Sequence, residues 1–299
     1  MNASADPDRS SHPDSHDSAT GSVQPDTPKR TGGRLWAFVL IGLSFAAFYQ
    51  LRDIPKWVTV QRHRAAAEDA RQANDWEIAI AELNKAIDRD PSPLIYADRS
   101  RIRHEKAVLE RRSEDSKEYA KFHATAELAL ADINQSIELG ATPESYVQRA
   151  LIHETLDRFR ESAEDWTHFL HSYNAPHSSD QVDLGTATGL NGRAYMRALG
   201  EFEIEEAIQD IEKALSILSK DFGDRFTYED THAYLLLLKG ESSEAVEKFE
   251  DCVAAAKQAH KKLRTINAQD GLAVIVHHRG LAYQATGKQA AAEADFKRA

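Results

Sequence analysis

The sequence has few of the residues that characterise disulfide-bonded domains, nucleic-acid-binding proteins or β-sheet proteins. Its 299 residues include a single cysteine, Cys252, so no intramolecular disulfide can form. The net charge at pH 7 is −11, which argues against a surface built to bind phosphate backbones. No run of β-branched residues alternates with polar ones, as strands would require. We therefore expect an all-α protein that does not bind nucleic acid.

Motifs for catalysis and cofactor binding are also missing. The sequence has no phosphate loop ending in Gly-Lys-Ser/Thr, no His-Glu-x-x-His and no Gly-x-Ser-x-Gly. His277 and His278 are adjacent, and neighbours on a helix point about 100° apart, so they cannot chelate one metal from one face. Cys252 is expected to be a packed thiol, and the many carboxylates are expected to lie on solvated helix faces. The sequence thus predicts a non-enzyme with no catalytic residue, metal or cofactor.

A short motif, in contrast, occurs six times. Each copy begins with a small residue, has a large one four positions later and, in most copies, a small one three positions after that. On a helix these positions share one face, and small residues allow two helices to cross closely. The first residues of the copies, called the leading residues below, are Ala79, Ala129, Ser162, Ala207, Ala245 and Ala292.

The last copy shows the context of the motif most clearly. Gly280 and Tyr283 share one face of an expected helix, Gly287 ends it, and Ala292 lies on the next helix. This pattern resembles a helix-turn-helix unit of the tetratricopeptide repeat (TPR) family, whose period is about 34 residues. One unit cannot bury its own apolar face, so the resemblance implies a right-handed α-solenoid of about six degenerate TPR-like repeats. Only one interval between leading residues is near the family period, so insertions are expected.

The N-terminal sequence differs in character from the repeats. Residues 1–31 are rich in Ser, Asp, Pro and His and are expected to be a disordered tail, because they cannot bury enough apolar surface. Residues 35–51 carry no charge, and we expect residues 35–54 to cross a lipid bilayer as a single transmembrane helix. A cleaved signal peptide and a buried soluble helix are weaker alternatives. Flanking positive charges do not separate the two sides, but we favour a cytoplasmic N-terminus with the repeats outside the cytoplasmic membrane.

The expected α-solenoid covers residues 59–299. Within it, residues 101–128 contain many charges and no turn residue, and they are expected to form elongated helices with a solvated tip. Residues 172–183 are the best candidate for a hinge between two groups of three repeats. At the C-terminal end, we favour the polar residues of the last helix as a cap over stacking on another chain.

The TPR resemblance implies a groove, lined by the first helix of each repeat, in which a peptide or a partner's helix binds. Family members that capture a chaperone's C-terminal carboxylate use Lys and Asn at fixed groove positions, and that set is missing here. Three arginines remain available for acidic side chains of a partner. By helical position, the groove-facing candidates are Arg64, Glu68, Arg71, Arg101, His104, Leu151, Glu154 and Tyr234.

The sequence therefore predicts a membrane-anchored TPR scaffold or adaptor that mediates protein–protein interaction, with assembly of a membrane or envelope complex as its role. The alternative is a non-catalytic accessory subunit of an enzyme or transport machine, which would co-purify with one partner. A third and weaker alternative is an enzyme with an unrecognised site in residues 101–128.

Overall fold

A computed structural model describes residues 56–173, 182–263 and 266–299. The expected tail at residues 1–31, the expected transmembrane helix at 35–54 and most of the expected hinge lie outside these ranges. All regular structure in the described ranges is helical. Within them, no helix combines the length and the apolar character that crossing a bilayer requires.

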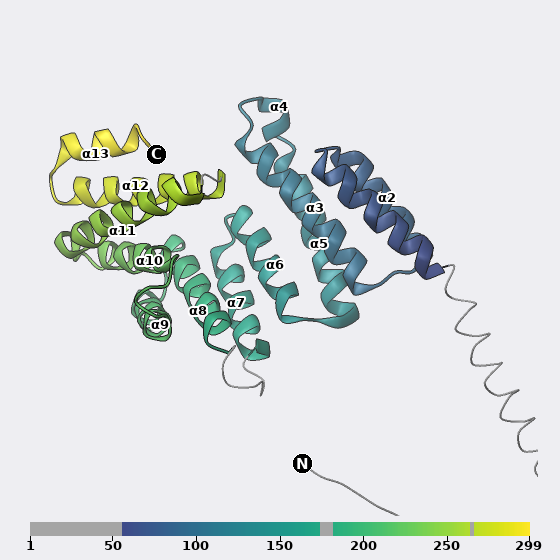
Figure 1. Cartoon of the computed structure of the whole chain (residues 1–299), viewed down its shortest axis with the longest axis horizontal. Helices are drawn as coiled ribbons and strands as arrows, with labels where there is room; N and C mark the ends of the chain where they lie inside the picture. Colours follow the sequence, from purple (N-terminus) through teal and green to yellow (C-terminus); the bar gives the residue numbers. More distant parts are fainter. Residues whose placement is uncertain (1–55, 174–181, 264–265) are drawn as a thin grey trace, which may run out of the picture. The chain divides into compact units, whose positions relative to one another are not determined.

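The helices follow one another as helix-turn-helix pairs (Figure 1). A helix at residues 56–72 pairs with α2, α3 pairs with α5 across the short α4, and the later helices pair in order from α6 and α7 to α12 and α13. Each pair from α3 onward also packs on the pair before it. The labelled helices are α2 (Trp76–Arg89), α3 (Pro93–Arg112), α4 (Ser116–Tyr119), α5 (Phe122–Gly140), α6 (Pro143–Thr155), α7 (Phe159–Tyr173), α8 (Val182–Leu199), α9 (Ile204–Ile217), α10 (Arg225–Leu238), α11 (Ser242–Leu263), α12 (Ile266–Ala285) and α13 (Gln289–Phe296).

The leading residues occupy the most buried places in the array. All of them have 0% exposed surface. The large residue four positions later is also buried in every pair except the last, where Phe296 is 36% exposed. In that pair a Cβ atom at Gly280 would lie 2.6 Å from the Phe296 ring, so a side chain at position 280 would force this ring to move. The predicted all-α array of helix-turn-helix units is confirmed.

The turn inside most pairs uses a left-handed residue to end the first helix. Asn74, Asp157, Gly240 and Gly287 all have positive φ, and each precedes its leading residue by five positions. The amide after each of them donates to a carbonyl five residues back, as in a Schellman motif, which satisfies carbonyls at the helix end. In the fourth pair this role falls to Glu201, the residue after Gly200. These turns end the first helix of each pair and lead the chain into the second.

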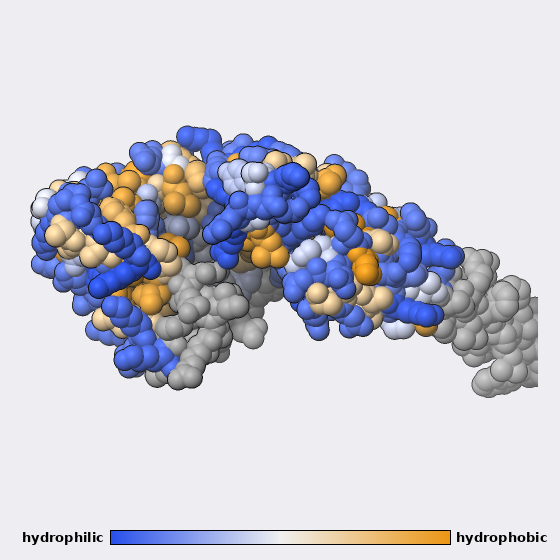
Figure 2. Space-filling model, turned by 90° about the horizontal axis from the view of Figure 1, so that it is seen from above, coloured by the Kyte–Doolittle hydropathy of each residue, from blue (hydrophilic) through white to orange (hydrophobic). Residues whose placement is uncertain are grey.

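The second pair has longer helices than its neighbours. Pro93 begins α3 at its first turn, where a missing amide costs nothing, and α3 continues to Arg112. The short α4 is capped by Asp115, whose side chain accepts a hydrogen bond from the Lys117 amide. On the face drawn in Figure 2, hydrophilic residues cover most of the surface and apolar residues gather in separate groups.

Candidate functional site

The candidate groove residues all lie on the first helices of the pairs. Three are on the helix at residues 56–72, two on α3, two on α6 and one on α10. These first helices contact one another directly, since α3 touches α6, α8 touches α10, and α10 touches α12. The candidates nevertheless fall into three separate environments.

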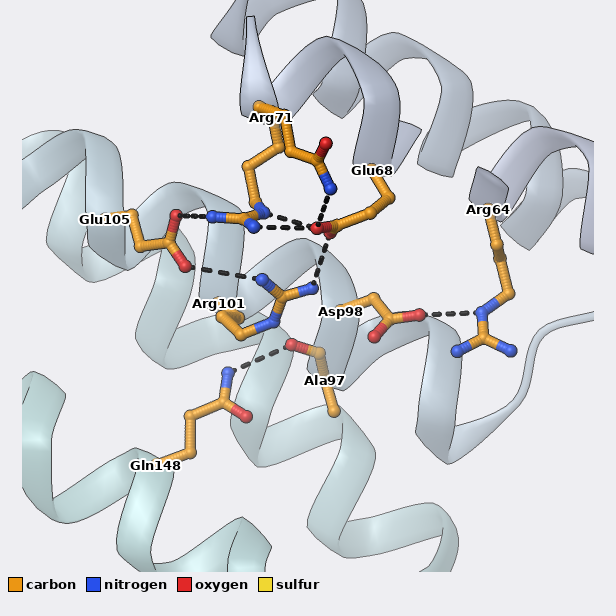
Figure 3. Close-up of polar contacts among 9 residues, drawn as sticks. Arg64, Glu68, Arg71, Ala97, Asp98, Arg101, Glu105 and Gln148 are labelled. Carbon is orange, nitrogen blue, oxygen red and sulfur yellow. Dashed lines mark hydrogen bonds and ion pairs between the residues drawn. The ribbon is translucent and has the colours of Figure 1, made fainter. Parts of the chain in front are cut away.

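The first environment is a charged network between the helix at residues 56–72 and α3 (Figure 3). Arg71 donates to Glu68 at 2.7 and 2.9 Å and to Glu105 at 2.9 Å. Arg101 donates to the same two carboxylates, each at 3.3 Å. Beside them, the Arg64 Nε lies 2.7 Å from an Asp98 carboxylate oxygen.

The charges of this network compensate one another within the chain. Hydrogen bonds from Arg71 lower the pKa of Glu68 to about 2, so the carboxylate is ionised at neutral pH. Arg64, Arg71 and Arg101 each face a carboxylate of the chain, and an acidic partner would have to compete with those pairs. The three arginines that the sequence left available to an acidic partner are therefore already paired with carboxylates of the chain itself.

The second environment is a hollow of about 640 Å³ formed by residues of α3, α6, α7 and α8 and of the α6–α7 turn. It brings together the candidates His104, Leu151 and Glu154. The expected insertion contributes directly to its wall, because His104 and Arg111 belong to the long α3. The other lining residues are Val108, Arg112, Thr155, Asp157, Phe159 and Leu199.

Most polar groups of the hollow have partners within the chain. The Arg111 guanidinium donates to the Asp157 carboxylate at 2.9 and 3.1 Å and to the Thr155 carbonyl at 2.6 Å. The His104 Nε2 lies 2.8 Å from the Thr155 hydroxyl, and burial lowers the pKa of His104, so the ring is neutral at pH 7.

Glu154 is the exception in this hollow. Its side chain accepts no hydrogen bond from any described residue. Burial raises the pKa of Glu154, and the attraction of Arg111 opposes this shift only in part. The Tyr195 phenol on α8 lies near enough for the charges of Glu154 and Asp230 to raise its pKa further, beyond the effect of its own burial.

The third environment surrounds Tyr234, the remaining candidate. Its ring stacks on His278 of α12 with centroids 4.4 Å apart and planes 9° apart. The His278 Nδ1 lies 3.0 Å from an Asp230 oxygen, and both residues are buried. Tyr234 thus packs on a buried contact between His278 and Asp230 that the sequence analysis missed. The neighbouring His277 and His278 have ring centroids 6.3 Å apart, and the described residues hold no group of three metal-ligating side chains.

A second feature that the sequence analysis missed is a contact between an acidic and a basic side chain that recurs inside the helix pairs. We call each such contact a rung and the series the ladder. In five pairs the acidic residue three positions after the leading residue contacts a basic side chain of the first helix, which is His63 in the first pair and an arginine in the others. The arginines of three rungs also donate to the second helix of the preceding pair, at Asn84, Asn134 and Thr167. The rungs are His63–Glu82, Arg99–Asp132, Arg149–Asp165, Arg193–Asp210 and Arg279–Asp295.

The ladder corrects the expectation that the carboxylates are solvated. Asp132, Asp165, Asp210 and Asp295 are buried, and a buried carboxylate is retained only when cations or donors surround it. The recurrence of an acid at one place in the motif was the signal for this feature. In the fifth pair that place holds Lys248, and the rung is absent. Cys252, in contrast, is confirmed as a packed thiol, since it is 1% exposed and burial raises its pKa.

A solved protein shares the fold of this chain. No family model and no curated protein matches the sequence. Among solved structures, a tetratricopeptide repeat protein from Parabacteroides merdae ATCC 43184 is 18% identical, with a TM-score of 0.53 over 80% of this chain and 78% of that chain. The chain has the TPR fold. BtubC (BKLC) from P. vanneervenii is 20% identical, with a TM-score of 0.47 over 80% of this chain and 89% of that one.

Proposed function

We propose that this chain is a membrane-anchored TPR protein that holds a segment of a partner protein on the surface of its first helices. TPR arrays generally serve as protein-binding surfaces. The role we propose is that of a scaffold or adaptor in the assembly of a membrane or envelope complex. A non-catalytic accessory subunit of an enzyme or transport machine is the alternative.

The hollow over α3, α6 and α8 is the observation that carries this proposal. Its volume of about 640 Å³ is within the ~300–1,000 Å³ typical of ligand sites. Leu151 is 41% exposed at its edge, an apolar group left uncovered on a first helix. A partner that covers this side chain removes apolar surface from water, which favours binding.

The sequence of residues 35–54 supports the membrane anchor. Its uncharged run is long enough to cross the hydrocarbon core. We propose a single pass with the N-terminus in the cytoplasm and the repeats outside the cytoplasmic membrane. Protease protection of a C-terminal tag tests this orientation. Digestion only after the inner membrane is breached would refute it.

Site-specific photo-crosslinking in cells tests the binding surface. A photoreactive amino acid replaces Leu151 in one variant and Glu164, an exposed residue of the second helix α7, in the control. We expect a discrete adduct from position 151 and none from position 164. Equal adducts from both positions, or none from either, would contradict the proposal. A single protein in stoichiometric amount would favour the accessory subunit, and several different proteins would favour the scaffold.

A further inference from the structure

Some charged side chains around the hollow have partners within the chain and Glu154 accepts no hydrogen bond from any described residue. This difference determines which chemical group of a partner fits the hollow. Arg111 is bonded to Asp157, Arg112 also has an interaction partner, and His104 is neutral at pH 7. Among the described residues lining the hollow, Glu154 is left as the acidic group whose side chain accepts no hydrogen bond. Glu154 is therefore the charged group of the hollow that a hydrogen-bond donor from a partner can still reach.

An ionised carboxylate in this position is costly for the free protein. Burial disfavours its charged form, which is why the pKa of Glu154 is raised. A cation that arrives with a partner would supply the missing donors, and charge-assisted hydrogen bonds are about twice as strong as neutral ones. The free protein thus holds a carboxylate whose environment improves when a cation binds.

The apolar residues of the hollow indicate what kind of side chain would carry that cation. Leu151, Val108 and Leu199 border the hollow together with Glu154, so a cation bound to Glu154 would lie beside apolar surface. Lysine and arginine side chains have this construction, with an aliphatic stem and a charged end. An acidic side chain would meet Glu154 with the same sign of charge, which is unfavourable.

We propose that the hollow binds a lysine or arginine side chain of the partner protein, with the charged end on Glu154 and the aliphatic stem on Leu151 and Leu199. This inference rests on the proposed function and names the chemistry of its partner. The sequence alone left Arg64, Arg71 and Arg101 available to acidic side chains of a partner. Those arginines face Glu68, Asp98 and Glu105 instead.

Selection of a random peptide library on the immobilised full-length chain tests the inference. Selections use the wild type, Glu154→Gln and the matched control Glu164→Gln, which removes the same charge from the exposed face of α7. We expect wild-type and control chains to enrich peptides with a lysine or arginine beside an aliphatic residue. The Glu154→Gln chain should enrich the aliphatic residue alone.

Affinity measurements then locate the contact. For a selected peptide, Glu154→Gln should raise Kd about tenfold, equivalent to ~1.4 kcal/mol, while Glu164→Gln leaves it unchanged. Replacing the basic residue of the peptide by norleucine should weaken binding to the wild type equally and weaken binding to Glu154→Gln no further. This pattern assigns the effect to one pair of groups rather than to a general change of charge.

The outcomes separate this inference from the proposed function. Peptides whose binding is blocked by Leu151→Trp but that carry no enriched basic residue would overturn the inference and leave the groove function standing. Enrichment of Asp or Glu, or equal affinity for wild type and Glu154→Gln, would overturn it in the same way. A library that yields no Leu151-dependent peptide would overturn both.

Discussion

The Arg149–Asp165 rung offers a stringent test of how this array is stabilised. The Asp165 carboxylate accepts three hydrogen bonds from Arg149, at 3.0, 3.0 and 2.6 Å, and its side chain is 3% exposed. The Arg149 side chain is 22% exposed and also donates to Asn134 of the preceding pair at 2.9 Å. The rung thus links α6 to α7 and to α5.

We expect Asp165→Asn to destabilise the protein by about 3 kcal/mol. Removing one partner of a buried ion pair costs ~3–5 kcal/mol, whereas an exposed pair contributes ~0–1 kcal/mol. Because Asp165 is buried, we use the cost for a buried pair. We take the low end of that range because Arg149 is partly hydrated and keeps its hydrogen bond to Asn134. The matched control Glu164→Gln, one position earlier on an exposed face, should change stability by less than ~0.5 kcal/mol.

Urea unfolding followed by far-UV circular dichroism measures both variants. The double variant Arg149→Met, Asp165→Leu should lose less free energy of unfolding than its two single variants lose together. The difference should be at least ~1.5 kcal/mol, because each single change leaves a buried group unpaired and the double change does not. A loss below about 1 kcal/mol for Asp165→Asn, or simple additivity in the double variant, would refute the argument that the ladder holds the repeats together.

Two further predictions concern the turns and the pH dependence of stability. Glu201→Gly should stabilise the chain by ~1 kcal/mol, because Glu201 is held at φ 52°, where glycine is less strained than glutamate. Gly287→Ala should destabilise the chain by a similar amount, because Gly287 has φ 76°. Thermal melts of both variants check these two predictions, and a shift of the melting temperature in the same direction for both would contradict them. Burial lowers the pKa of His104, so the unfolded chain takes up a proton first as the pH falls. The contribution of the neutral His104 ring to the free energy of unfolding should be fully present above about pH 6.5 and should decline as the pH falls below it. Urea unfolding should therefore show a smaller decrease in stability between pH 7.5 and 5.5 for His104→Asn than for the wild type.

The sequence alone determined the helical repeat and its core. Spacing of small and large residues located each second helix, because a residue at a close helix crossing must be small whatever surrounds it. The leading residues are fully buried as that reasoning requires, and Gly287 ends its helix as its conformational freedom predicts. These features depend on neighbours a few residues apart, which a sequence displays directly.

The tertiary structure decided which charges are free. The sequence showed arginines at 64, 71 and 101 on the expected groove face, but not the carboxylates that face them across the helix pairs (Figure 3). It also did not show that Asp165 and its counterparts are buried, or that Glu154 lacks a hydrogen-bond partner among the described residues. Ion pairing depends on distances between residues that are 16 to 34 positions apart in the chain, and packing of the helices sets those distances. The sign of the charge that the hollow offers a partner is therefore a property of the fold.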